Sequence, residues 1–66
     1  MGNISLLEQN RMIIVNVNDS AEHLSILENI PGNTKARTKA KEALRAAQVS
    51  ITKLLNELEN LSKNKS

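Results

Sequence analysis

The chain has no cysteine and no aromatic residue, and Pro31 is its only proline. Without cysteine it forms no disulfide and lacks a zinc-finger pattern. The absence of cysteine is compatible with either an oxidising or a reducing compartment. Without Phe, Tyr or Trp it has no large rings to fill a core or to stack on the bases of single-stranded nucleic acid. Because a chain of only 66 residues buries a small share of its surface on folding, these absences predict one small, marginally stable domain that needs partner chains.

Long apolar runs are also absent, because the longest unbroken one covers only residues 12–15. A membrane-spanning helix needs about 20 apolar residues, and the core of a signal peptide needs at least about seven. The sequence therefore predicts no membrane association, and we expect a cytoplasmic protein.

The clearest helix-breaking signal lies at residues 30–34, where Pro31 and Gly32 interrupt a sequence otherwise compatible with helix. Proline and glycine end one helix, and Asn33 or Thr34 can cap the next. The whole chain is therefore predicted to be a single helical-hairpin domain. We expect a first helix over about residues 5–30, a second over about 35–61, and a frayed polar tail at 62–66.

The second helix is rich in Ala, Leu, Lys and Glu and contains neither Gly nor Pro. Its apolar residues recur at alternating steps of four and three, which is typical of a helix face that packs against other helices. We predict that this stripe is an oligomer interface. It consists of Ala40, Leu44, Ala47, Ile51, Leu54, Leu58 and Leu61.

The first half of the chain carries the same spacing but is more ambiguous. Ser5 followed by Glu8 has the form of a capping box, which favours a helix that begins there. Against this, residues 12–18 are dense in β-branched side chains and Asn, and Asp19 with Glu22 offers a second capping box. Since no second strand-like segment is present to pair with a strand, we predict a continuous helix, with a break near residues 16–19 as the alternative.

Two such helices joined by a short turn form an antiparallel hairpin, so the predicted fold class is all-α. A single hairpin cannot cover the apolar residues that lie outside the main stripes. These are Met12, Val15, Ile26 and Ile30 in the first helix and Ala43, Val49 and Leu55 in the second. Pairing two hairpins into a homodimeric four-helix bundle is the simplest closed arrangement that covers them.

Charge is divided unevenly between the halves. Residues 1–30 hold four acidic residues and one basic residue, whereas residues 31–66 hold eight basic and three acidic residues. Five cations gather at the start of the second helix, and we call them the basic cluster: Lys35, Arg37, Lys39, Lys41 and Arg45. They are predicted either to pair with the acids of the first helix, Asp19, Glu22 and Glu28, or to bind an anion or an acidic partner. The second interpretation arises because the helix dipole disfavours cations at a helix N-terminus and favours bound anions there.

No residue pattern indicates catalysis. Asp19, Ser20 and His23 are the residue types of a hydrolytic triad, but they are neighbours on one stretch and cannot converge on a substrate from separate elements. One histidine among scattered carboxylates does not make a metal site. We therefore predict no enzymatic activity, no catalytic residue, no metal and no cofactor.

These features predict a small, non-enzymatic helical binding protein. We expect it to associate with itself as a homodimer or higher oligomer and to bind or sequester another protein, as a regulator or inhibitor of the phage or plasmid type. Two alternatives remain open. In one, the basic cluster binds nucleic acid or a small nucleotide, which salt would weaken steeply. In the other, the hairpins build a structural scaffold.

Overall fold

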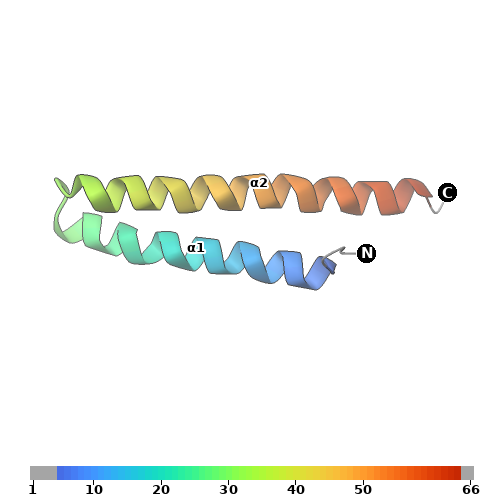
Figure 1. Ribbon diagram of the computed structural model, residues 1–66, viewed down its shortest axis with the longest axis horizontal. Coiled ribbons are helices and arrows are strands. Elements are labelled where there is room, and N and C mark those ends of the chain that lie inside the picture. Colours follow the sequence, from blue (N-terminus) through green and yellow to red (C-terminus); the bar gives the residue numbers. More distant parts are fainter. Residues whose placement is uncertain (1–4, 65–66) are drawn as a thin grey trace.

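The protein is a hairpin of two antiparallel helices (Figure 1). The structure, a computed structural model, describes the backbone of residues 5–64 and the side chains of residues 5–61. Helix α1 is Leu6–Asn29 and helix α2 is Thr34–Asn64. Within the described residues there is no strand, so the predicted helix over residues 12–18 is confirmed and the strand alternative is wrong. Helix α2 continues three residues past its expected end, and the last part of the expected tail, 65–66, lies outside the described residues.

Ser5 caps the N-terminus of α1, as the sequence indicates. Its side-chain oxygen accepts a hydrogen bond from the backbone N–H of Glu8 at 3.0 Å. Its carbonyl accepts the backbone N–H of Gln9, also at 3.0 Å. The first bond satisfies an N–H group that has no backbone partner within the helix, and the second is the first backbone bond of the helix itself. The helix then passes Asp19 without interruption, so the second capping signal does not begin a new helix.

The connection is a four-residue turn, 30–33, with Pro31 and Gly32 at its centre. The backbone N–H of Ile30 donates to the carbonyl of Ile26 at 2.8 Å and closes α1, and the N–H of Asn33 donates to the carbonyl of Ile30 at 3.0 Å. Proline at the second turn position fixes the backbone angle that such a turn requires. The Asn33 side-chain oxygen then accepts the N–H of Ala36 at 3.0 Å, so Asn33 rather than Thr34 caps α2.

Asn33→Ala removes this capping bond, and we expect it to lower the free energy of unfolding by about 1 kcal/mol. Asn33→Asp is the matched control, because its carboxylate accepts the same bond and carries the charge that a helix N-terminus favours. Chemical denaturation followed by circular dichroism measures both variants. Equal losses in the two would contradict a capping role.

Gly32→Ala is expected to raise the free energy of unfolding by about 0.4–1 kcal/mol. The Gly32 backbone lies outside the left-handed region, and an added Cβ would meet no heavy atom within 4 Å. Alanine therefore fits the folded turn and restricts only the unfolded chain. Thermal unfolding measures the effect, and a destabilised variant would show that the turn requires glycine.

The contact between the helices, here called the seam, is built from small side chains. Residues facing the seam recur at steps of three and four, with Ile13 and Ser20 buried in α1 and four alanines buried in α2: Ala36, Ala40, Ala43 and Ala47. Ser20 is only 2% exposed, and its hydroxyl donates to the Val17 carbonyl at 2.6 Å, so burial leaves the hydroxyl paired. Small residues let two helices approach closely.

Large apolar side chains lie mostly outside the seam. Among the residues with described side chains, 5–61, no large side chain is fully buried and 15 large hydrophobic residues are exposed. The hairpin measures 52 × 18 × 15 Å, and its radius of gyration is 15.5 Å, against about 11 Å for a compact domain of this length. It exposes 5357 Å², whereas a compact monomer of this mass exposes about 4,200 Å². The difference of about 1,200 Å² exceeds the roughly 800 Å² per partner that a standard protein interface buries.

Candidate functional site

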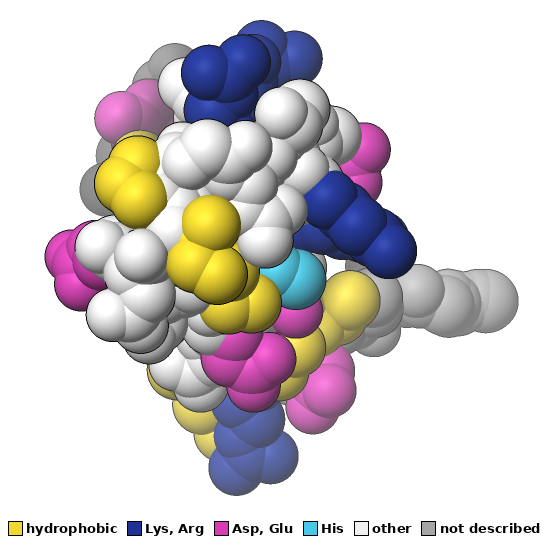
Figure 2. Space-filling view, turned by 90° about the vertical axis from the view of Figure 1, so that its left-hand side faces the viewer, with side chains coloured by type: hydrophobic (Ala, Val, Ile, Leu, Met, Phe, Trp, Pro, Cys, Tyr) yellow, Lys and Arg dark blue, Asp and Glu magenta, His cyan; other side chains and the backbone are white. Residues whose placement is uncertain are grey.

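The basic cluster lies on the first turns of α2, next to the turn between the helices. Lys35, Arg37, Lys39, Lys41 and Arg45 are all exposed. Figure 2 looks onto this end of the molecule and shows groups of Lys and Arg side chains over α2, in its upper part, with apolar side chains open to solvent beside them. The cluster is thus available to a ligand or a partner.

The cluster divides into two groups on different flanks of α2. Arg37, Lys41 and Arg45 follow one another at steps of four and share one flank. Lys35 and Lys39 belong to another flank, where they line a shallow depression of about 180 Å³ together with Asn33, Ala36, His23 and Ile26. Two of the five cations therefore line one hollow, which lies between the turn ends of α1 and α2.

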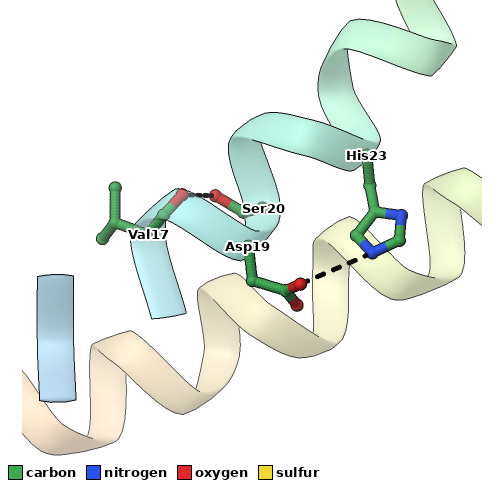
Figure 3. A network of polar contacts seen from close by, with 4 residues as sticks. All are labelled: Val17, Asp19, Ser20 and His23. Atoms are coloured by element: carbon green, nitrogen blue, oxygen red, sulfur yellow. Dashed lines mark hydrogen bonds and ion pairs between the residues drawn. The ribbon is translucent and has the colours of Figure 1, made fainter. Parts of the chain in front are cut away.

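The predicted ion pairs between the two helices are not seen among the described residues. The predicted pairs joined the basic cluster to Asp19, Glu22 and Glu28, yet among residues 5–61 no ion pair within 4.0 Å links these two sets. Asp19 instead faces His23 one turn along the same helix, with 3.7 Å between its Oδ1 and the His23 Nε2 (Figure 3). Within residues 5–61 the basic cluster therefore forms no ion pair, and its side chains are exposed.

Asp19, Ser20 and His23 do not form a catalytic arrangement. Figure 3 shows the Ser20 hydroxyl turned to the carbonyl of Val17, on the same helix, rather than to the His23 ring. A nucleophilic serine needs a base within hydrogen-bond reach, and here the buried hydroxyl is occupied by its own backbone. Ser20 is buried against α2, whereas Asp19 and His23 face each other along α1.

The predicted oligomer stripe of α2 is divided between two surfaces. Ala40 and Ala47 are buried in the seam against α1, and Leu54 is half-buried there. The other four members remain exposed, between 41% and 49%, and so are free for another chain: Leu44, Ile51, Leu58 and Leu61. Whether they form an interface between copies remains a prediction.

One flank of the seam is apolar in both helices. In an antiparallel pair, the row with Leu44, Ile51 and Leu58 in α2 lies on the same side as the row with Val17 and Leu24 in α1. These five side chains are 41–46% exposed, which fits a position beside the seam. Their more exposed neighbours on the same side are Leu7, Ile14 and Leu55. We call these eight residues the apolar face.

A smaller apolar strip follows the opposite flank of α1, and we call it the outer stripe. It consists of Met12, Val15 and Ile26, and Val15 is 65% exposed. The α2 row on the same flank holds Lys39 and Lys53, and the α1 row also carries Glu8, Asp19 and Glu22 between its apolar residues. The hairpin thus has a larger face that is largely apolar and a narrower one of mixed apolar and charged character.

Helical spacing groups Val17 and Leu24 on one stripe of α1 with Leu7 beside it, but spacing alone does not place them on a common surface with α2. A stripe at steps of three and four covers a wide arc of a helix, and only the choice of seam decides which part stays open. The signal was the seven-residue step in both helices, from Val17 to Leu24 and from Leu44 through Ile51 to Leu58.

Comparison with protein-family models, with curated proteins and with solved structures gives no match. Within residues 5–64, neither helix combines the length and apolar character needed to cross a membrane. The same part of the chain has no group of three or more His, Cys, Asp or Glu residues placed to hold a metal ion. The exposed surfaces are therefore the features on which a functional proposal rests.

Proposed function

We propose that this protein is a non-enzymatic binding protein that works as a homodimer and acts by occupying another protein. In the dimer, two hairpins pack through their apolar faces into a four-helix bundle. The observation that carries the proposal is the apolar face itself, because the seam uses alanines and leaves the large apolar side chains open. A face of this extent on a small hairpin supports a stable contact with another chain.

A second copy is the occupant that suits the apolar face best. Its two helical rows have the seven-residue spacing of helices that pack in bundles, and a second copy presents the same spacing. The two-fold arrangement closes, so it needs no further chain. It also provides the large buried side chains that a single hairpin lacks.

The outer stripe is then the surface left for the partner protein. Met12, Val15 and Ile26 lie on the flank away from the apolar face and stay exposed when two hairpins pair. With Lys39 and Lys53 across the seam and Glu8, Asp19 and Glu22 between the apolar residues of α1, the flank suits a partner whose contact surface is apolar with charges of both signs at its edge. A protein of this kind regulates or inhibits its partner by covering a surface that the partner needs.

Affinity capture from cells of the native host tests this proposal. The double variant Val15→Lys, Ile26→Lys changes only exposed positions of the outer stripe, so we expect it to keep its helix content and its dimer. A host protein held by the wild type and lost by this variant, after nuclease treatment, is the expected result. Equal recovery with the variant, or recovery that depends on nucleic acid, contradicts the proposal.

Anion binding is the second candidate, and the depression beside Lys35 and Lys39 favours it. Both lysines lack an acidic partner among the described residues, and the N-terminus of α2 adds a field that attracts anions. A labelled 20-base-pair RNA duplex is a suitable probe, with fluorescence anisotropy as the measurement. If the depression binds RNA, the double variant Lys35→Gln, Lys39→Gln lowers the slope of log affinity against log salt concentration by about 2. Lys53→Gln, which removes one exposed positive charge elsewhere on α2, is the control. Unchanged binding of the double variant excludes the depression as the site.

A further inference from the structure

The last turns of α2 extend beyond α1 (Figure 1). The side-chain nitrogen of Gln9 donates to Glu57 Oε1 at 3.1 Å, which places Glu57 level with the first turn of α1. Along the seam row of α2, exposure rises from 3% at Ala47 to 49% at Leu61, because α1 begins only at Leu6. Leu58 and Leu61 thus lie on an overhang, where no other helix of the described residues covers them.

The two ends of α2 differ in charge and in side-chain size. At the turn end, the helix rows that carry the apolar face hold Arg37 and Lys41 in place of apolar residues, and the seam beside them is lined by alanines. At the open end the same rows hold Leu55 and Leu58, next to Glu59. The turn end of the face is therefore basic with small side chains, and the open end has large apolar side chains and an acidic residue. This complementarity affects the orientation in which a second copy can pack on the face.

Two closed arrangements bring apolar faces together. If the turn ends lie side by side, the basic clusters of both copies meet, and both overhangs project from the same end without a cover. If the hairpins run in opposite directions, the clusters lie near opposite ends of an assembly based on hairpins 52 Å long. That separation is several times the screening length of about 8 Å at physiological ionic strength.

We infer that the second copy packs antiparallel on the apolar face, so that the overhang of each α2 covers the turn end of its partner. Leucines of the open end then lie against the alanine-rich end, which keeps the bundle evenly filled. The aliphatic stems of Arg37 and Lys41 lie over the partner's Leu58, and their charged groups are beside the partner's Glu59. The inference rests on the proposed function, because it requires a dimer.

Spin labels test this orientation, because the chain contains no cysteine of its own. Gly32→Cys places a label at the turn, where the space around the backbone is open. Thr52→Cys places a label on the solvent-facing side of α2, near the middle of the overlap in either arrangement. Pulsed electron paramagnetic resonance measures the distance between the two labels of each labelled dimer.

For Gly32→Cys we expect a separation of about 50 Å, close to the length of a 31-residue helix. A distance near 20 Å, about two helix diameters, means that the turn ends lie together and overturns the antiparallel arrangement. The Thr52→Cys control is expected near 30 Å in both arrangements, since its labels are separated mainly by the width of the bundle. A monomer in sedimentation, with no coupling for Thr52→Cys, instead overturns the dimer and this inference with it.

Discussion

Ile51→Glu is expected to separate the dimer and to unfold most of the resulting monomer. In the isolated hairpin Ile51 is 41% exposed, so a glutamate there meets water and costs little. In the proposed bundle the same position lies at the centre of the apolar face, where an unpaired carboxylate is strongly disfavoured. We expect the dissociation constant to rise at least about 100-fold, equivalent to about 2.8 kcal/mol.

Size-exclusion chromatography with light scattering measures the mass of this variant, and circular dichroism measures its helix content. Thr52→Glu is the matched control, because it introduces the same charge one residue away on the solvent-facing side of α2. The control is expected to keep both the dimer and the helix. A variant at Ile51 that behaves like the control would show that the apolar face is not an interface.

Ala40→Leu is expected to destabilise the hairpin by overfilling the seam. Ala40 is 3% exposed and lies in a row of alanines that allows α1 and α2 to approach closely. A leucine there forces the helices apart or into strained side-chain conformations, at a cost of about 1–3 kcal/mol. The melting temperature should fall by about 5–20 °C.

Ala46→Leu is the control for this experiment, since Ala46 carries the same side chain in the same helix but is exposed. Its expected change in stability is within about 0.5 kcal/mol, as for other surface substitutions. Differential scanning calorimetry compares the two variants at one protein concentration. If both melt at the wild-type temperature, the alanines do not form a tight seam.

Local signals in the sequence were sufficient to predict the helices and their connection. Pro31 interrupts any helix at its position, Ser5 and Asn33 have the side chains that cap helix starts, and α2 contains no helix breaker. The ambiguity over residues 12–18 was also resolved by a physical argument, because a lone strand has no partner for its backbone groups. The helix-breaking and capping signals depend on residues close together in the chain.

The division between the seam and the apolar face was not predictable in the same way. The alternation of four and three groups Ala40 with Leu44 and Ala47 with Ile51 on one broad stripe. Which members face α1 depends on how closely two helices pack, and close packing selects the small residues. For the basic cluster, helical spacing already separates Lys35 and Lys39 from Arg37, but the depression that these two lysines line forms only once α1 and the turn are in place.

Sedimentation equilibrium of the unmodified chain at low micromolar concentration tests the central claim most directly. We expect a species of twice the chain mass of 7.3 kDa, with helix content that falls as dilution drives the dimer apart. A monomer of 7.3 kDa that retains its full helix content on dilution would contradict the account.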